Sequence, residues 1–292
     1  MCGIVGYVGG RSALDVVIAG LQRLEYRGYD SAGVAVPADG GLAVAKKAGK
    51  LANLHKELAE RPLPAGTSGV GHTRWATHGA PNDTNAHPHL DNSGRVAVVH
   101  NGIIENFARL RTELTDRGHE LTSETDTEVV AHLLAESFSS TGDLAEAMRQ
   151  VCKQLEGAFT LVAACADEPD VVVGARRNSP LVVGVGDGES FLASDVAAFI
   201  EYTREAVELG QDQVVEVRRE GVTVTDFAGA SADVRPYHID WDASAAEKGG
   251  YDYFMLKEIA EQPRAVADTL LGRIDAAGEL TLKAVENKNG NK

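Results

Sequence analysis

The feature that most constrains the fold is a series of short apolar runs in the second half of the chain, each bounded by turn residues. AFTLVAACA, DVVVGARR, PLVVGVG, SFLASD, QVVEVRR and GVTVTDF follow one another between residues 158 and 227. Runs separated by turn residues every 8–12 positions or so are typical of strands in an antiparallel sheet. Nearer the N-terminus, GIVGYV at 3–8 indicates a buried strand, and 31–37 with 41–49 indicate a strand pair around a Gly-Gly turn.

Helix signals are grouped before and between these strands. Ser12 can cap a helix, and further helical patterns lie at 51–60, about 107–118 and about 143–156. We expect the helix from about 107 to end at Gly118, a glycine suited to a C-cap. The apolar face expected on the first helix consists of Leu14, Val17, Ile18, Leu21 and Leu24. Because the strands are linked by hairpins and do not alternate with helices, we expect a layered α+β fold and not repeated βαβ units.

The sequence pattern changes near residue 233, where the series of apolar strands ends. We expect one domain at 2–235, a linker at 236–250 and a helical segment at 251–282 that is broken at Pro263. The last residues, 283–292, are rich in Asn, Lys and Gly without apolar content, which predicts a disordered tail.

Composition excludes several classes of function. The chain of 292 residues has a net charge of −15, and such an acidic surface repels phosphate backbones, so nucleic acid is not expected as a partner. No apolar run approaches the roughly 20 residues that cross a bilayer, so no membrane association is expected. The first residues lack the pattern of a secretory signal, and an odd count of three cysteines argues for a reducing compartment. We therefore expect a cytoplasmic protein.

Cys2 directly follows the initiator methionine. One interpretation is a small apolar residue at the start of a buried strand. The other is a nucleophile, because removal of Met1 would place a thiol and a free α-amine on one residue. Their ordinary pKa values are about 8.5 and about 7.7–8.0, so proton transfer between them is nearly thermoneutral and the terminal cysteine carries its own base. On this feature alone both interpretations remain open.

Asn101 and Gly102 offer donors for an oxyanion. A nucleophile that attacks an amide needs hydrogen-bond donors where negative charge develops, and HNGII at 100–104 supplies a side-chain amide beside an unobstructed glycine N–H. Asn-Gly between apolar stretches is also the commonest hairpin turn signal. The segment that follows turns helical and no return strand comes directly after it, which weakens the hairpin interpretation.

Two further segments carry residues suited to binding a charged ligand. HTRWATHG at 72–79 contains an arginine for bidentate carboxylate binding beside a flat apolar tryptophan, although an ordinary hydrogen-bonded loop would look similar. In TSETDTEV, Thr125 and Glu128 have the spacing of a capping box, which places Asp126 near the start of a helix. A carboxylate there is stabilised by the helix dipole, and it could equally bind a ligand ammonium.

A metal site is conceivable at NAHPH, where His87 and His89 have an H-x-H spacing and His100 follows. No acidic or thiol ligand stands at metal spacing beside them. We therefore expect these histidines to be structural.

The motifs form a set. MCGIVGY, LEYRGYDSAG, HTRWATHG, NAHPH, VVHNGIIEN and SETDTEV, in this order, closely resemble the N-terminal glutaminase domain of the glutamine–fructose-6-phosphate aminotransferase (glucosamine-6-phosphate synthase) family, among the class II glutamine amidotransferases. The resemblance covers roughly residues 2–240 and continues into YFMLKEIAEQP, which is similar to the first helix of the family's sugar-isomerase half. It implies the four-layer αββα sandwich of N-terminal-nucleophile hydrolases.

The resemblance also implies roles for individual residues. Cys2, freed of Met1, would attack the side-chain amide of L-glutamine, giving glutamate and ammonia through a thioester. Asn101 and the Gly102 N–H would form the oxyanion hole. Arg74 would bind the α-carboxylate of the substrate, and Asp126 would bind its α-ammonium group. Trp75, Thr77 and His78 would shape the site, and Arg27 with Gly28 would help to close the nucleophile's pocket. No metal or organic cofactor is expected.

In the full-length enzymes of this family the ammonia converts fructose 6-phosphate to glucosamine 6-phosphate, and the whole protein is expected to be a homodimer. This chain differs from the pattern of the family in three ways. Most of the isomerase half is not in these 292 residues, and Met1 precedes the nucleophile in the sequence. RRNSPLVVG has Asn178 where the family usually has glycine, and because asparagine tolerates the left-handed conformation, we expect the turn to survive.

Three alternatives remain open. Another class II enzyme, such as an amidophosphoribosyltransferase or an asparagine synthetase, is disfavoured by HTRWATHG, NAHPH and SETDTE. An N-terminal-nucleophile protease or acylase is disfavoured because Arg74 and Asp126 suit a free amino acid. A non-catalytic glutamine-binding module would still bind glutamine after Cys2→Ala.

Overall fold

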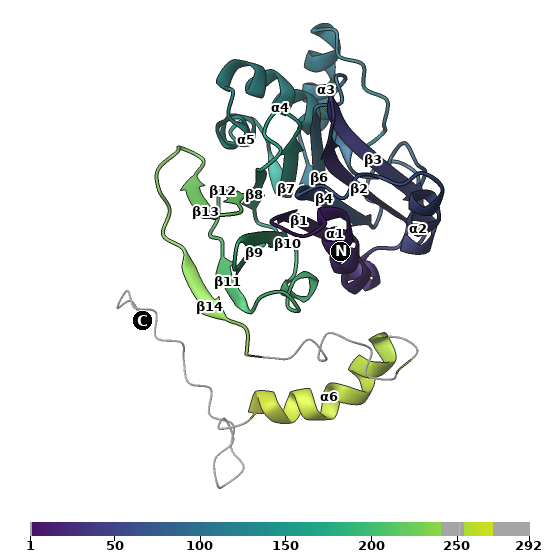
Figure 1. The fold of residues 1–292 in the computed structure, drawn as a ribbon, viewed down its shortest axis with the longest axis vertical. Coiled ribbons are helices and arrows are strands. Elements are labelled where there is room, and N and C mark those ends of the chain that lie inside the picture. The colour runs from purple at the N-terminus through teal and green to yellow at the C-terminus, as the bar shows by residue number, and fades with distance from the viewer. Residues whose placement is uncertain (1, 241–250, 252–253, 271–292) are drawn as a thin grey trace. The chain divides into compact units, whose positions relative to one another are not determined.

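The computed structural model describes residues 2–240, 251 and 254–270. The chain divides into two compact units, residues 1–243 and 244–292. The first unit holds both sheets (Figure 1). In the second unit, helix α6 (Phe254–Leu270) runs through Pro263 without ending, so the expected break there is wrong. The expected tail at 283–292 lies outside the described residues.

Sheet A is an antiparallel sheet of eight strands in the order β14-β11-β9-β10-β1-β4-β2-β3. Its central strand β1 pairs with β10 on one side and β4 on the other, although β10 lies far along the chain. The strands are β1 (Gly3–Val8), β2 (Ser31–Ala38), β3 (Gly41–Ala48), β4 (Ser68–Arg74), β9 (Val182–Gly186), β10 (Glu189–Ala193), β11 (Glu205–Glu208) and β14 (Arg235–His238).

Sheet B has six antiparallel strands in the order β13-β12-β8-β7-β6-β5. The strands are β5 (His89–Leu90), β6 (Val96–Ile104), β7 (Gly157–Cys165), β8 (Val172–Arg177), β12 (Gln213–Arg218) and β13 (Gly221–Asp226). The apolar runs of the second half are strands, as expected, but they are divided between the two sheets. Periodicity identifies a strand and does not identify its partner.

The helices cover the outer faces of the two sheets (Figure 1). Helices α1 and α2 pack on sheet A, and α4 and α5 pack on sheet B, with α3 against α4. The helices are α1 (Ala13–Leu24), α2 (Leu51–Glu60), α3 (Phe107–Asp116), α4 (Glu128–Thr141) and α5 (Leu144–Cys152), and the short 3-10 helices are η1 (Glu25–Arg27) and η2 (Val196–Ala198). The order helix, sheet, sheet, helix confirms the expected αββα layering.

Among the described residues, two apolar clusters hold sheet A against sheet B and sheet B against its helices. One lies between the sheets and contains buried residues of both, including Ile4 and Val70 of sheet A and Ala97 and Val99 of sheet B. The other lies between sheet B and helices α3 to α5, and Val96 and Val98 belong to it. Burial of this much apolar surface is the main force that fixes the layers.

The alternation of side chains along a strand decides which residues reach the space between the sheets. On β1, Ile4 and Val8 point into the inter-sheet core, so Cys2, which precedes the strand in the same parity, is directed the same way. Val70 on β4 is followed in this parity by His72 and Arg74. Val99 on β6 is followed by Asn101. The strand pattern thus brings polar residues of both sheets to one end of the inter-sheet layer.

Several local expectations are corrected. Residues 235–238 form β14 and pair with β11, so the linker does not begin at 236, and the rest of the expected linker lies largely outside the described residues. On α1, Leu14 and Ile18 are only half-buried, and the buried face is Ala13, Val16, Val17, Gly20, Leu21 and Leu24. Ser12 does cap this helix, since its hydroxyl accepts from the Asp15 N–H at 3.3 Å.

The expected capping box of Thr125 and Glu128 is wrong. Helix α4 begins at Glu128, and its N-cap residue Thr127 makes no side-chain capping bond. The Glu128 carboxylate instead accepts hydrogen bonds from the preceding loop, and the Thr125 hydroxyl bonds to His89. Asn178 has φ of 55°, which confirms that asparagine takes the left-handed conformation at that turn.

Candidate active site

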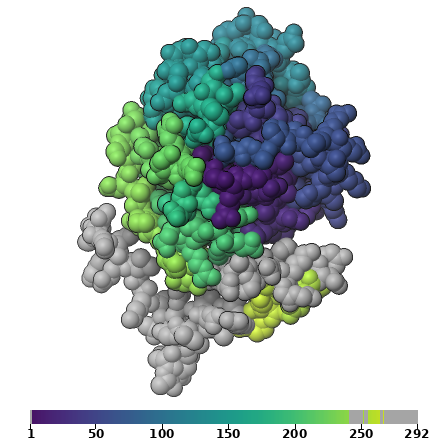
Figure 2. All heavy atoms as spheres, viewed as in Figure 1, coloured from purple at the N-terminus to yellow at the C-terminus, as the bar shows by residue number. Residues whose placement is uncertain are grey.

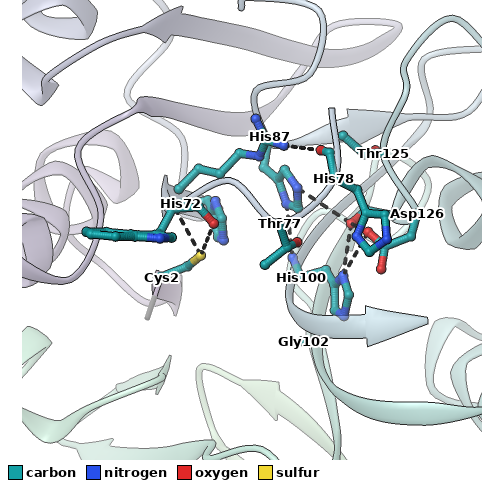
Figure 3. A pocket seen from close by; sticks show the side chains of 12 residues that line it. Cys2, His72, Thr77, His78, His87, His100, Gly102, Thr125 and Asp126 are labelled. Atoms are coloured by element: carbon teal, nitrogen blue, oxygen red, sulfur yellow. Dashed lines mark hydrogen bonds and ion pairs between the residues drawn. The ribbon is translucent and has the colours of Figure 1, made fainter. Parts of the chain in front are cut away.

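A pocket opens at the end of the inter-sheet layer where Cys2 lies (Figure 3). In the space-filling view the purple N-terminal atoms reach the surface of this unit (Figure 2). Cys2 stands on one side of the pocket, and His78, His100 and Asp126 stand on the other, with Thr77 between them (Figure 3). The pocket is lined by Cys2, His72, Arg74, Trp75, Thr77, His78, His87, His100, Gly102, Thr125, Asp126 and Thr127.

The thiol of Cys2 lies against the backbone of Trp75. The Trp75 N–H donates to the sulfur at 3.1 Å, and the sulfur lies 3.4 Å from the Trp75 carbonyl oxygen. Burial raises the pKa of the Cys2 thiol, and the hydrogen bond from Trp75 opposes that rise. A thiol in this state needs a base that removes its proton before or during attack.

Asn101 joins the two sheets at the nucleophile. Its side-chain Nδ2 donates to the backbone carbonyl of Cys2 at 2.9 Å, and its Oδ1 lies 2.9 Å from Nε2 of His72. An amide NH₂ has two hydrogens. One is used on Cys2, and the other is available to an oxygen that approaches the thiol.

Gly102 lines the same pocket in a conformation that only glycine adopts readily. Its φ is +127°, and a Cβ at this position would lie 2.0 Å from the carbonyl oxygen of Ala158 on the neighbouring strand. Asn101 and Gly102 stay in β6, paired with Thr160 and Phe159 of β7. The Asn-Gly pair is therefore not a hairpin turn, which settles the alternative that the sequence left open.

Arg74 is a buried cation at the end of β4, with 3% of its surface exposed. Its Nη2 donates to the carbonyls of His78 and Gly79, which fixes the course of the loop after the strand. Its Nη1 lies 4.0 Å from Asp30 and, among the described residues, has no hydrogen-bond partner. Arg74 lines the pocket, and a buried guanidinium N–H without a hydrogen-bond partner suits an anionic ligand.

Asp126 supplies a negative charge to the pocket. Its carboxylate accepts from the Ile104 N–H at 2.8 Å and lies 3.9 Å from Nδ1 of His100. The loop that carries it is held by Glu128, whose buried carboxylate accepts from the backbone N–H groups of Thr122 and Ser123 at 2.8 Å and 2.7 Å. The hydrogen bonds of Glu128 therefore fix the segment that presents Asp126.

The other residues of the 72–79 motif lie around the mouth of the pocket. Trp75 is 51% exposed, and its ring meets Tyr29 edge to face at 5.5 Å. Thr77 is exposed, and the half-buried ring of His78 packs on Phe107 at 5.4 Å. The structure thus brings Trp75, Thr77 and His78 to the pocket with Cys2 and Asp126.

Arg27 and Gly28 do not line the pocket. The Arg27 guanidinium forms an ion pair with Asp195 and lies over the ring of Tyr26. A Cβ on Gly28 would lie 2.7–2.9 Å from backbone atoms of Arg74 and Thr73, so glycine is required for this close approach. Their expected part in closing the site remains a prediction.

Four histidines at the pocket are buried: His72, His87 and His100 line it, and His89 packs against His87. His72 and His87 are stacked at 4.3 Å, and the His87 and His89 rings meet at 4.8 Å. Burial lowers the pKa of each, that of His72 to about 3, which keeps the rings neutral. His87 accepts from the His100 N–H, and His89 bonds to Thr125.

The partners in these contacts are other residues of the protein, and the structural role expected for these histidines stays a prediction. Within residues 2–240, 251 and 254–270, no group of three His, Cys, Asp or Glu side chains has the geometry of a metal site. In the same part of the chain, no helix is both long enough and apolar enough to span a membrane.

Comparison with known proteins decides the class of domain. Residues 72–201, which include Arg74, Asn101 and Asp126, match the family model described as "Glutamine amidotransferase domain". The chain contains a glutamine amidotransferase domain. It is 79% identical over 285 residues to the glutamine–fructose-6-phosphate aminotransferase [isomerizing] of Streptomyces coelicolor, covering 98% of this chain and 46% of that protein. The chain spans about half the length of the curated relatives it matches.

Solved structures share the fold of the amidotransferase domain. A structure titled the allosteric regulatory enzyme of purine biosynthesis aligns with a TM-score of 0.68 at 26% identity over 77% of this chain and 49% of that one. The glutamine phosphoribosylpyrophosphate amidotransferase of B. subtilis aligns with a TM-score of 0.65 at 24% identity over the same shares. The expected N-terminal-nucleophile hydrolase fold is confirmed.

Sequence reasoning missed several residues that the amidotransferase domain places at its pocket. The pocket is lined by His72, Thr125 and Thr127. Each belongs to a motif in which the sequence analysis gave the binding role to a neighbouring residue. Parity along β4 is a signal that could have found His72, because it lies two residues before Arg74 on the same face. The Thr127 hydroxyl bridges His100 at 2.9 Å and His87 at 3.5 Å, and only the fold reveals that contact.

Proposed function

We propose that this amidotransferase domain hydrolyses the side-chain amide of L-glutamine to glutamate and ammonia, with Cys2 as the nucleophile. One observation carries the proposal. A single pocket is lined by a thiol, a buried cation with an unpartnered N–H and a carboxylate, and the side-chain amide of Asn101 donates to the residue that carries the thiol. These are the groups that a free amino acid with a reactive amide requires.

Substrate binding follows from the two charges. The Nη1 of Arg74 suits the α-carboxylate of glutamine, and Asp126 suits its α-ammonium group. Trp75, Thr77 and His78 lie at the mouth of the pocket and would shape it around the side chain. Arg27 and Gly28 would help to close the nucleophile's side after substrate enters.

The reaction has two halves. The α-amine of Cys2, exposed by removal of Met1, takes the thiol proton as sulfur attacks the amide carbon. The resulting oxyanion accepts hydrogen bonds from Nδ2 of Asn101 and the N–H of Gly102. The carbon–nitrogen bond then breaks, ammonia leaves with the transferred proton, and a γ-glutamyl thioester remains on Cys2. Water attacks the thioester, which restores the thiol and releases glutamate.

The ammonia has a destination in a longer protein. The relatives are named glutamine–fructose-6-phosphate aminotransferases, and in a chain of their length the ammonia would convert fructose 6-phosphate to glucosamine 6-phosphate. The glutaminase domain would end near residue 240, and α6 would begin the sugar-isomerase part. We further propose that the full-length protein is a homodimer and that it is cytoplasmic, and three free cysteines support the second of these proposals.

A stoichiometric assay tests the proposal. The chain with Met1 removed should release glutamate and ammonia in equal amounts from glutamine, and Cys2→Ala should lower the rate at least about 10³-fold. Calorimetry on Cys2→Ala should still detect glutamine binding, because Arg74 and Asp126 remain. Hydrolysis that persists in Cys2→Ala would remove the proposed nucleophile, and loss of binding would show a structural effect.

A further inference from the structure

Asn101 is held between two partners, and only one of them belongs to the nucleophile. The Cys2 carbonyl accepts from Nδ2, and on the opposite side His72 Nε2 lies 2.9 Å from Oδ1. His72 belongs to β4 of sheet A, and Asn101 belongs to β6 of sheet B. This contact therefore crosses the inter-sheet layer at the pocket.

The two contacts define the direction of the amide and the position of one proton. A backbone carbonyl only accepts, so the Cys2 carbonyl requires the NH₂ end of the Asn101 amide to face it. The Oδ1 end then faces His72, and because a carboxamide oxygen also only accepts, Nε2 of His72 must carry a hydrogen. Burial lowers the pKa of His72 to about 3, so the ring is neutral and this hydrogen is its only one.

The ring of His72 has little freedom to move. The side chain is 1% exposed, and its ring is stacked on that of His87 at 4.3 Å with an interplanar angle of 15°. On the adjacent strand Gly33 is paired with His72, and a Cβ there would lie 2.2 Å from the carbonyl oxygen of His87. Because the His72 ring is held in place, its N–H can fix the position of Oδ1 of Asn101.

We propose that His72 is a positioning residue for the oxyanion hole: its Nε2–H holds Oδ1 of Asn101, so that one Nδ2 hydrogen bonds to Cys2 and the other faces the oxyanion. This rests on the proposed glutaminase function. His72 touches neither the substrate amide nor the thiol in this scheme, and it acts through Asn101. Its loss lets the amide rotate away from the position where charge develops, and such misplacement lowers kcat more than it changes KM.

A double-mutant cycle tests whether His72 acts through Asn101. We expect His72→Leu to lower kcat for glutamine about 10- to 100-fold with KM changed less than about threefold. In an Asn101→Ala background the same change should cost no more than about twofold, because the group that it positions is gone. His72→Gln, which restores an N–H donor of similar reach, should recover at least part of kcat.

Results of two kinds overturn the proposal. One is a wild-type kcat in His72→Leu, and the other is a loss in the Asn101→Ala background as large as in the parent. His132→Leu is the matched control, since His132 is a fully buried histidine of α4 outside the pocket. It should leave kcat within about twofold, and a loss equal to that of His72→Leu would show a general effect of removing a core histidine.

A second measurement does not depend on activity or on a substituted His72. Nitrogen-15 NMR of the wild-type histidines should show His72 neutral with its hydrogen on Nε2, and Asn101→Ala should shift that resonance. A hydrogen on Nδ1 instead, or a resonance unmoved by Asn101→Ala, contradicts the proposal. If the wild-type chain fails to hydrolyse glutamine, the proposed function fails, and this spectrum still decides the contact.

Discussion

The side-chain amide of Asn101 donates to the backbone carbonyl of Cys2 over 2.9 Å and so joins the start of sheet A to sheet B. Cys2 directly precedes β1 in the parity of its inner face, and β6 places Asn101 on the inner face opposite. A nucleophile and a donor that sit on different sheets keep their distance only while the inter-sheet core is intact. The packing of the two sheets therefore sets the geometry of the site.

Gly102→Ala should lower both stability and activity. The new methyl group would meet the Ala158 carbonyl at 2.0 Å in a backbone with φ of +127°, so β6 must move away from β7. We expect the free energy of unfolding to fall by about 3 kcal/mol or more and kcat to fall at least about tenfold.

The matched control for this change is Gly40→Ala. Gly40 also has a positive φ, +82°, but a Cβ there would meet open space. Chemical denaturation should show a loss of only about 1 kcal/mol, with kcat unchanged. Equal losses in the two variants would show that backbone strain alone, and not the contact with β7, accounts for Gly102.

Arg74→Lys should raise KM for glutamine about 10- to 100-fold. Lysine keeps the charge but cannot bond the loop carbonyls of His78 and Gly79 and a ligand carboxylate with one planar group. Steady-state kinetics measure the effect, with Arg109→Lys on the exposed face of α3 as the control. A wild-type KM in Arg74→Lys would show that the Arg74 guanidinium does not bind the substrate carboxylate.

Glu128→Gln should destabilise the loop that presents Asp126. The carboxylate accepts from two backbone N–H groups and from the hydroxyls of Thr122 and Ser123. In glutamine an NH₂ group replaces one of the two accepting oxygens, and this NH₂ would face N–H and O–H donors. We expect about 2 kcal/mol less stability and a several-fold higher KM. Glu113→Gln, on the exposed face of α3, is the control, and matching results in the two variants would contradict the role given to Glu128.

Stability should fall as the pH drops below about 6.5. Histidine in the unfolded chain binds a proton near that pH, whereas burial keeps the pKa of His72, His87 and His89 well below it in the folded chain. The unfolded state then holds more protons, so acid favours unfolding. Each of the three should cost about 1.4 kcal/mol at pH 5.5 relative to pH 7.5, about 4 kcal/mol together.

Urea unfolding at the two pH values measures this difference. His87→Gln should reduce it by about 1.4 kcal/mol, and His55→Gln, on the exposed side of α2, should leave it unchanged. A stability that is flat between pH 7.5 and 5.5 would show that these histidines are protonated in the folded protein.

Local patterns predicted the elements of this fold better than their arrangement. The strand at 3–8, the Ser12 cap and the left-handed Asn178 depend on neighbours in sequence, and all are confirmed. The pairing of β1 with β10 depends on contacts nearly 190 residues apart, which periodicity does not encode. The same limit explains why the apolar runs after residue 157 were not divided between two sheets.

The candidate site shows the same division. Asn101 and Gly102 were predicted as oxyanion donors from their residue types, but the hairpin alternative could be dismissed only when β6 was seen to pair with β7. The prediction of a capping box was wrong because the Glu128 carboxylate accepts hydrogen bonds from the N–H groups of Thr122 and Ser123 in the preceding loop. The contact between His72 and Asn101 crosses two sheets, and no spacing in the sequence indicates it.

The most direct test of the account is mass spectrometry after treatment with a γ-electrophilic analogue of glutamine. The account predicts one adduct per chain, mapped to Cys2, on molecules that have lost Met1, and protection by L-glutamate. Cys152 and Cys165 are fully buried and serve as internal controls that should stay unmodified. Chains without Met1 that gain no adduct at Cys2, or that carry it on another cysteine, would contradict the assignment of Cys2 as the nucleophile.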